Sequence, residues 1–303
     1  MSESDAPSTH ILELRELTVE RRGHGGERTI GVREVSFAVP QGSWFVIAGE
    51  SGSGKSLLCE AILGTSFTKL RLIAGEIEFD GAPIGSLTRR EKRQLRAGPI
   101  AAISREVREQ INPSMIASNW IEEVVENLPK SSRPKARKDW GEILYQVGVI
   151  EPERVLPRRI SDLSSLMIQR LMLMRALLVG ARLLICDEPT AELDDIAEAQ
   201  FIDLLTQVRA STGLSILSTS GSLRGVERFA TDILMLYEGG VLELGPAEEL
   251  VRNPRYQYTA EFIECSPRIS QAPRALASIT RAANREAADV IRRASSPLLG
   301  KEL

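Results

Sequence analysis

A glycine-rich run at residues 49–56, GESGSGKS, constrains the fold of this 303-residue chain more than any other stretch. It matches the phosphate-binding pattern G-x-x-x-x-G-K-[ST] at every fixed position. The short apolar run before it, residues 44–48, predicts a buried strand, and residues 57–63 predict a helix that ends at Gly64. Because strand, glycine-rich turn and helix are the context in which this pattern binds phosphate, the flanks disfavour the alternative of a turn that binds nothing.

The chemistry of phosphate binding explains the residue types in this run. Glycines let backbone N–H groups approach a phosphate closely, and the start of the following helix adds partial positive charge. Lys55 is expected to reach the outer phosphates, and the hydroxyl of Ser56 is expected to ligate Mg²⁺. The predicted nucleotide-binding residues of the run are Gly49, Glu50, Ser51, Gly52, Ser53, Gly54, Lys55 and Ser56.

Composition and charge exclude several other classes of protein. The net charge of −3 gives no sign of nucleic-acid binding, and 43% apolar residues suffice for a folded core. Cys59, Cys186 and Cys265 are too few and too scattered for a disulfide framework or a zinc site, and the first two lie in apolar runs. No stretch resembles a signal peptide or approaches the ~20 apolar residues of a membrane span, so we expect a cytoplasmic protein that contacts a membrane only through a partner.

Strand and helix patterns alternate along the chain. Strands are expected at residues 11–19, 32–39, 44–48, 75–81, 100–104, 182–188, 214–218, 233–237 and 241–244. Helices are expected at residues 57–63, 86–96, 114–128, 134–147, 164–179 and 195–210. The alternation predicts an α/β fold whose sheet is mainly parallel, with the helical block before residue 180 as an insertion. The helix at 86–96 is basic and has little apolar content, so it is expected to be a solvated surface helix.

A second motif lies about 130 residues after the phosphate loop. The apolar strand predicted at residues 182–188 ends in two carboxylates, Asp187 and Glu188. An aspartate at such a position binds Mg²⁺, directly or through water, and a neighbouring glutamate can polarise a water for attack on the γ-phosphate. The pair is weak on its own, because many strands end in acidic residues, but it is followed by the run Pro-Thr-Ala-Glu-Leu-Asp at residues 189–194.

With these residues the chain resembles the ATP-binding subunits of ABC transporters over about residues 12–262. The string LLICDEPTAELD is similar to the Walker B strand, catalytic glutamate and D-loop of that family. Within the family the chain is most similar to the importer branch for oligopeptides, dipeptides and nickel. That similarity lies in SGSGKSLLCEAILG, in Ile111-Asn112-Pro113, in residues 200–205 and in GPAEELVRNPRYQYT.

The resemblance implies a fold, two cofactors and a set of roles. The fold is that of a P-loop NTPase of the ABC ATPase type, with a RecA-like, mainly parallel sheet core, an antiparallel β subdomain and an inserted helical subdomain. ATP and Mg²⁺ are the implied cofactors. Lys55 and the loop amides would hold the phosphates, Ser56 and Asp187 would bind Mg²⁺, and Glu188 would be the catalytic residue that activates water.

The resemblance also implies domain boundaries. We expect a frayed N-terminus at residues 1–10, a nucleotide-binding core at 11–104 and 180–255, a helical subdomain at 105–179 and a C-terminal helical extension at 256–303. In that extension, residues 274–294 are rich in alanine and arginine with apolar residues near helical spacing. They are compatible with a docking helix and equally with a marginal helix in a loosely ordered tail.

Two departures from the family affect its catalytic groups. The family places a histidine after the strand beyond Walker B, where it contacts the γ-phosphate, but this chain has only His10 and His24, both before the phosphate loop. Residues 217–222 lie in the equivalent place and offer hydroxyls and a glycine. The family's Q-loop glutamine corresponds to Arg105, although Gln110 is near enough to substitute for it.

Other departures affect contacts with a partner and with adenine. The signature Leu-Ser-Gly-Gly-x-x-Gln corresponds to residues 163–169, LSSLMIQ, in which Ser164 remains and both glycines are absent. A γ-phosphate must approach that backbone closely, and Leu166 would crowd it. Arg21 and Arg22 stand where the family has an aromatic residue on adenine, although a guanidinium can also stack on a purine. The tail has only Cys265 where many relatives have a cysteine cluster.

These observations predict a subunit that powers an ABC-type importer of peptide-like or nickel-like cargo and hydrolyses ATP weakly by itself. Its expected partners are a second, more complete ABC ATPase subunit and transmembrane permease subunits, which would hold it at the inner face of the cell membrane. The alternatives are an ABC-type ATPase of a soluble, non-transport complex and a binding-only nucleotide module. A P-loop kinase or GTPase is disfavoured, because the chain has no guanine-binding Asn-Lys-x-Asp.

Overall fold

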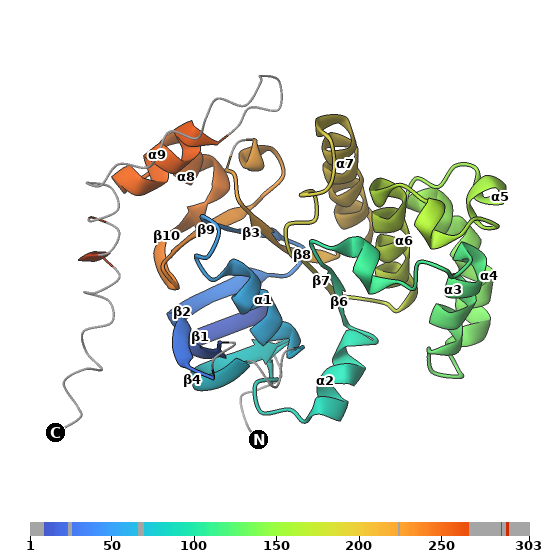
Figure 1. Cartoon of the computed structure of the whole chain (residues 1–303), viewed down its shortest axis with the longest axis horizontal. Helices are drawn as coiled ribbons and strands as arrows, with labels where there is room; N and C mark the ends of the chain where they lie inside the picture. The colour runs from blue at the N-terminus through green and yellow to red at the C-terminus, as the bar shows by residue number, and fades with distance from the viewer. Residues whose placement is uncertain are drawn as a thin grey trace. The chain divides into compact units, whose positions relative to one another are not determined.

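A computed structural model describes residues 9–23, 26–65, 70–223 and 225–266, together with Glu286, Asp289 and Val290 (Figure 1). The sequence predicts a frayed N-terminus at residues 1–10. Residues 1–8 lie outside the described residues, and His10 begins a strand instead. The predicted docking helix or loose tail at residues 274–294 also lies outside the described residues, except for those three positions.

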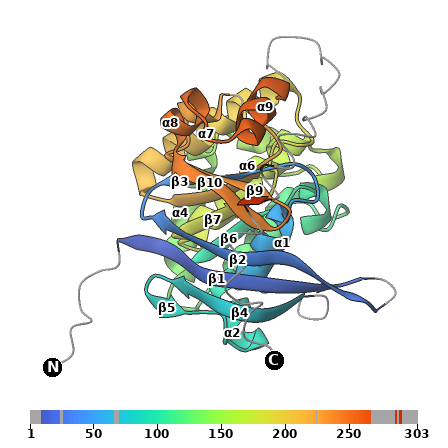
Figure 2. The same ribbon diagram turned by 90° about the vertical axis from the view of Figure 1, so that its left-hand side faces the viewer.

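The N-terminal strands form an antiparallel sheet in the order β2-β1-β4-β5 (Figure 2). The strands are β1 His10–Arg22, β2 Arg28–Pro40, β4 Leu70–Phe79 and β5 Ala82–Pro83. β1 and β2 are longer than the predicted 11–19 and 32–39, because their pairing continues to Arg22 opposite Arg28. The added residues are exposed or only partly buried and show no apolar alternation, so only the backbone hydrogen bonds reveal them.

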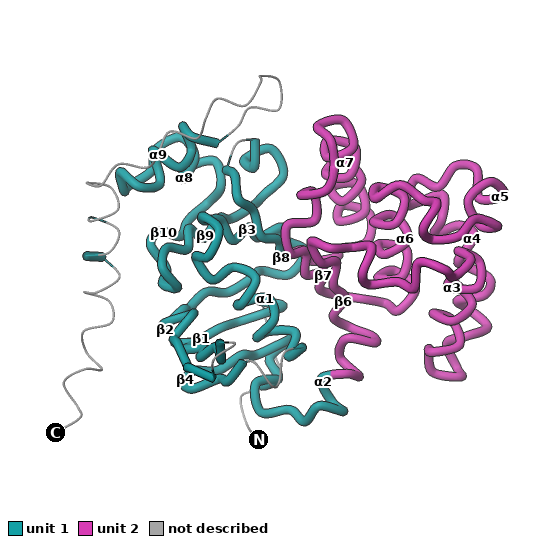
Figure 3. Tube along the Cα trace, viewed as in Figure 1, with its two compact units in different colours: residues 1–92, 217–303 teal, residues 93–216 magenta. Residues whose placement is uncertain are grey.

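The chain divides into two compact units, residues 1–92 with 217–303 and residues 93–216 (Figure 3). The first, called unit 1, contains the antiparallel sheet, the fully buried strand β3 Trp44–Ala48 and the helix α1 Lys55–Leu63. β3 pairs in parallel with β9 Asp232–Tyr237, and β9 pairs in antiparallel with β10 Gly240–Pro246. Unit 1 also contains a 3₁₀ turn at Val226–Arg228 and the helices α8 Ala247–Arg252 and α9 Gln257–Cys265.

The second unit, unit 2, pairs two parallel strands with the predicted helical insertion. The strands β6 Ile100–Ile103 and β7 Leu183–Cys186 are fully or largely buried and pair from Ile100 opposite Leu183 to Ile103 opposite Cys186. The helices are α3 Ala117–Glu126, α4 Arg133–Gln146, α5 Pro152–Val155, α6 Ser165–Leu178 and α7 Asp195–Thr212, with 3₁₀ turns at Val107–Gln110 and Ile160–Asp162. The helix α2 Arg89–Arg96 and the strand β8 Ser215–Ser220 run across the division between the units.

Burial of the helices follows the sequence pattern. α6 buries residues around most of its circumference, and α7 buries Phe201, Leu204, Leu205 and Val208 at helical spacing on one face. α2 buries no residue, as the basic composition predicts. Cys59 and Cys186 are buried, and burial raises the pKa of the Cys186 thiol, so it is a core residue rather than a reactive one.

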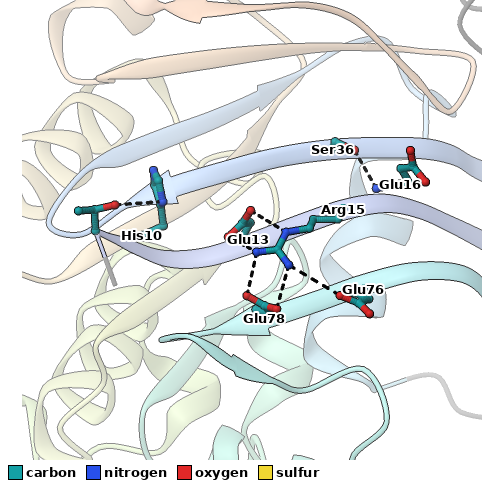
Figure 4. A network of polar contacts seen from close by, with 8 residues as sticks. His10, Glu13, Arg15, Glu16, Ser36, Glu76 and Glu78 are labelled. Atoms are coloured by element: carbon teal, nitrogen blue, oxygen red, sulfur yellow. Dashed lines mark hydrogen bonds and ion pairs between the residues drawn. The ribbon is translucent and has the colours of Figure 1, made fainter. Parts of the chain in front are cut away.

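An exposed network of charges lies across β1 and β4 in unit 1 (Figure 4). The Arg15 guanidinium contacts Glu13 at 2.9 Å, Glu78 at 3.1 Å and Glu76 at 3.8 Å. Its hydrogen bond to Glu13 lowers the pKa of that carboxyl. Arg15 is half exposed, so the network adds little to stability, and its main effect is to prevent like charges from repelling across the strands.

These elements confirm the predicted fold class, an α/β protein with parallel and antiparallel strands around a P-loop. The predicted domain boundaries stay a prediction, because the two compact units do not test them. Within the described part of the chain, no helix has both the length and the apolar character needed to cross a membrane.

Candidate functional site

The phosphate loop connects β3 to α1, as predicted, and two of its glycines lie against backbone oxygens. A Cβ added at Gly49 would meet the carbonyl oxygen of Leu236 at 2.4 Å, and one added at Gly54 would meet that of Gly31 at 2.8 Å. Both glycines also have φ in the left-handed region, +156° and +108°. Any side chain at these positions would therefore have to displace backbone, which explains why glycine occupies them.

Lys55 lies inside the curl of this loop. Its ammonium donates hydrogen bonds to the carbonyl oxygens of Gly49 at 2.7 Å and Glu50 at 3.0 Å, and the residue is 4% exposed. These bonds hold the ammonium beside the loop backbone, where an anionic ligand in the loop would form a charge-assisted contact with it.

Two further features of the loop fit a phosphate. Ser53 is buried, and its hydroxyl oxygen has no hydrogen-bond partner among the described residues. Gly54 caps α1 without any side-chain hydrogen bond, and the first turn of α1 contains no acidic residue. An unpartnered hydroxyl, a buried lysine and a helix N-terminus without an acidic cap together suit a group with several anionic oxygens.

The rest of unit 1 holds the loop in place. The Gly49 N–H donates to the Ser220 carbonyl at 3.3 Å, and the Gly239 N–H donates to the Ser53 carbonyl at 2.9 Å. Tyr258 of α9 packs edge-on against Tyr237, with ring centroids 4.6 Å apart. Burial, and after it the negative charge of Glu50, raises the pKa of Tyr258.

Two serine hydroxyls among residues 217–222, where the family's histidine would fall, form hydrogen bonds with other residues of unit 1. The Ser218 hydroxyl accepts a hydrogen bond from the Trp44 indole at 2.8 Å. The Ser220 hydroxyl donates to the Ser222 carbonyl at 2.5 Å and accepts from the Ser222 N–H at 3.1 Å. The Ser218 and Ser220 hydroxyls, two of those in this stretch, therefore help to hold β3 and the turn after β8.

Asp187 and Glu188 follow β7 in unit 2, as predicted. The Asp187 N–H donates to the Ile103 carbonyl at 2.9 Å, which continues the pairing of β6 with β7. Glu188 has φ of +45°, in the left-handed region, and its carbonyl accepts from Ala191 N–H at 3.1 Å. A glutamate in this conformation costs about 1–2 kcal/mol, and such strain is often found at functional positions.

Arg105 contacts the predicted catalytic residue. Its guanidinium lies 3.1 Å from the Glu188 carboxylate, with side-chain exposures of 56% for Arg105 and 21% for Glu188. Ile103 and Cys186 are paired at the ends of the parallel strands β6 and β7. Arg105 and Glu188 each lie two residues beyond that pair. The sequence placed Arg105 at the Q-loop position but contained no signal for this ion pair.

Gln110, the other candidate for the Q-loop role, is engaged elsewhere. Its side-chain oxygen accepts a hydrogen bond from the Ser104 N–H at 3.2 Å. This contact closes the turn between β6 and the 3₁₀ turn Val107–Gln110. Of the two candidates, Arg105 is the one whose side chain reaches Glu188.

The signature-like residues 163–169 also lie in unit 2. The Ser164 hydroxyl caps α6 by accepting from the Met167 N–H at 3.2 Å. Gln169 is fully buried, and its amide donates to the Pro189 carbonyl in the loop that follows Glu188. The Ser165 hydroxyl lies 3.5 Å from a Glu192 carboxylate oxygen. The signature helix and the D-loop are thus directly linked within this unit.

Removing the Ser164 cap is expected to destabilise unit 2 without changing its core. Ser164→Ala leaves a first-turn N–H of α6 without its side-chain partner, which costs about 1 kcal/mol in the free energy of unfolding. Urea denaturation measures the change. Ser165→Ala is the control, because it removes no cap and is expected to stay within about 0.5 kcal/mol. An equal loss in both variants would contradict the capping role.

The predicted site residues fall in both units. The phosphate-loop residues, including Ser56, belong to unit 1, and Asp187 and Glu188 belong to unit 2. No group of three or more His, Cys, Asp or Glu side chains that could hold a metal ion occurs among the residues that the structure describes. The Mg²⁺ site assigned to Ser56 and Asp187, and the catalytic role of Glu188, stay predictions.

Comparison with known sequences identifies several relatives. The family model described as "ABC transporter" matches residues 32–191. The chain is 32% identical to the dipeptide transport ATP-binding protein DppD of Escherichia coli (strain K12), over 89% of this chain and 82% of that protein. It is 30% identical to the oligopeptide transport ATP-binding protein OppD of Bacillus subtilis (strain 168), over 87% and 74%. It is also 32% identical to the peptidoglycan transport ATP-binding protein YejF of Agrobacterium fabrum, where 85% of this chain covers 47% of the longer protein.

Solved structures share the fold at lower sequence identity. The structure of cbiO1 from Clostridium perfringens, part of the ABC transporter complex cbiONQ, matches with a TM-score of 0.69 and 24% identity over 81% of this chain and 92% of that one. The ATP-binding cassette MJ0796, solved as a dimer bound to ADP and Pi, matches with a TM-score of 0.64 and 22% identity over 78% and 98%.

Proposed function

This chain belongs to the ABC transporter family of ATP-binding proteins, and on that premise we propose that it powers an importer of peptide-like cargo. Matches to dipeptide and oligopeptide transport proteins over most of their length support the cargo class. The buried Lys55 within a complete phosphate loop is the observation that carries the proposal, because importers of this family are driven by nucleotide binding.

The proposed ligand is Mg·ATP. The fold holds adenine nucleotide in a related cassette, which was solved with ADP and Pi. In this chain Lys55 and the loop amides would hold the β- and γ-phosphates, and the Ser56 hydroxyl would bind Mg²⁺ together with Asp187. Mg²⁺ would draw charge from the γ-phosphate, and Glu188 would accept a proton from the attacking water.

We propose that hydrolysis by this chain alone is weak. The stretch equivalent to the family's histidine contains no histidine, and its Ser218 and Ser220 hydroxyls bond to Trp44 and Ser222. Arg105 replaces the Q-loop glutamine and contacts Glu188. A missing preorganised donor to the γ-phosphate is worth roughly 10²–10³ in rate, by analogy with other enzymes. These losses favour a pairing with a second ABC ATPase subunit that retains the full set of groups.

The proposed assembly sits on the inner face of the cell membrane. It contains this chain, a second ATPase subunit and transmembrane permease subunits, which bind and move the cargo. A related cassette forms a dimer, which supports pairing of two such subunits. Because the described residues contain no membrane-spanning helix, attachment would depend on the permeases.

Purification of the intact complex tests this assignment. A tagged chain extracted in mild detergent is expected to bring down two membrane-spanning proteins and a second ABC ATPase, identified by mass spectrometry. A parallel purification from the soluble fraction is the control. Recovery of soluble partners alone would favour the second candidate, an ABC-type ATPase of a non-transport complex. Recovery of no partner would leave a binding-only nucleotide module as the better description.

A further inference from the structure

The contact between Arg105 and Glu188 bears on how fast this chain hydrolyses ATP. Glu188 is the residue to which the proposed function gives the role of general base. A general base must offer a carboxylate oxygen to the attacking water. One oxygen of Glu188 instead lies 3.1 Å from an Arg105 guanidinium nitrogen, so a strong donor competes with water for it.

The backbone brings the two residues together. β6 and β7 pair in parallel up to Ile103 opposite Cys186, and both side chains follow the carboxyl ends of these strands. The left-handed backbone of Glu188 and the hydrogen bond from the Ala191 N–H to its main-chain carbonyl fix the turn after β7. The amide oxygen of Gln110 accepts from the Ser104 N–H, and Arg105 is the candidate whose side chain reaches Glu188. Strand register thus brings the two chain segments together, and the two side chains meet there.

We propose that Arg105 is a positioning residue that holds Glu188 in an inactive arrangement and thereby slows hydrolysis at this chain's own site. The inference rests on the proposed function, since it assumes that Glu188 activates water. Arg105 is more than half exposed, so the ion pair is screened by salt and its restraint is modest. The restraint amounts to up to about fivefold in rate, which corresponds to about 1 kcal/mol.

Single-turnover hydrolysis of ATP by the purified full-length chain tests the proposal. Arg105→Met, which removes the charge without restoring the glutamine that the family has here, is expected to raise the rate by about two- to fivefold, and Arg105→Lys, which keeps the charge, is expected to raise it less. Combining Arg105→Met with Glu188→Gln is expected to abolish the gain, because the released group is Glu188. Raising the ionic strength to about 0.5 M is expected to speed the wild type but not Arg105→Met. A merely structural role of Arg105 would produce no such salt effect.

The chain offers a matched control pair on α5. Arg154 lies 3.0 Å from Glu151, with both side chains exposed and far from the phosphate loop and Walker B residues in sequence. Arg154→Met removes an exposed Arg–Glu ion pair and is expected to leave hydrolysis unchanged. An equal or slower rate in Arg105→Met, including turnover below detection in both proteins, would overturn the proposal. A slower rate would show instead that Arg105 assists nucleotide binding or hydrolysis.

Chemical labelling tests the contact without any nucleotide. A carbodiimide with glycine ethyl ester modifies carboxylates, and mass spectrometry locates the modified residues. Glu188 is expected to label at least twofold faster in Arg105→Met than in the wild type, and Glu151 is expected to respond in the same way in Arg154→Met. Unchanged labelling of Glu188, with a clear response at Glu151, would overturn the proposal. If the wild type binds no ATP, the proposed function fails, and labelling still decides whether Arg105 restrains Glu188.

Discussion

Replacing Lys55 by alanine is expected to weaken Mg·ATP binding by about ten- to a hundredfold. The ammonium is the only side-chain cation that the phosphate-loop motif itself supplies, and a charge-assisted contact to phosphate is worth about 1.5–3 kcal/mol. The present contacts of Lys55 with the Gly49 and Glu50 carbonyls show that the ammonium already points into the curl of the loop. Isothermal titration calorimetry with ATP and Mg²⁺ measures the loss.

A second lysine separates this effect from a general loss of charge. Lys92 also donates a hydrogen bond to a backbone carbonyl, that of Gly85 at 3.0 Å. It lies in α2, outside the phosphate loop. Lys92→Ala is expected to leave the affinity for ATP unchanged. Circular dichroism and urea denaturation check that both variants are folded. A folded Lys55→Ala protein with wild-type affinity would show that the loop does not bind nucleotide as proposed.

In the complex with a complete partner ATPase, the partner's catalytic glutamate is expected to carry most of the hydrolysis. The ABC ATPases that this chain resembles pair head to tail. Each ATP then lies between one subunit's phosphate loop and the other subunit's signature. The site built on Lys55 and Glu188 would lack the histidine and the glutamine. The other site would have all of the partner's catalytic groups but would face Ser165 and Leu166. Catalytic groups act on the breaking bond, whereas signature contacts mainly position the phosphate.

A pair of substitutions in the reconstituted complex measures this asymmetry. Glu188→Gln in this chain is expected to change steady-state turnover by less than about twofold. The matching glutamate-to-glutamine change in the partner is expected to lower it by at least about a hundredfold, the lower end of a general base's contribution. The reverse pattern would place the working site in this chain and would indicate that Leu166 blocks the partner's site.

Much of the fold could be predicted because local pattern and local structure agree. The apolar run of β3, the glycines at positions 49 and 54 and the stop at Gly64 are all read from neighbouring residues. Ser164 caps α6, and the apolar face of α7 is the buried face. The predicted strand boundaries were wrong where side chains carry little information. The ends of β1 and β2 are examples, because their length depends on backbone pairing.

The sequence by itself determined that this chain folds as a P-loop protein of the ABC family and which residues form its phosphate loop, because those features depend on short segments. Only the tertiary structure decided what the substituted catalytic positions do. Ser218 bonds to Trp44, 174 residues away along the chain. Arg105 meets Glu188 because two strands pair in one register, and Glu188 adopts a left-handed backbone that no propensity favours. Such contacts depend on distant segments, so no local pattern could indicate them.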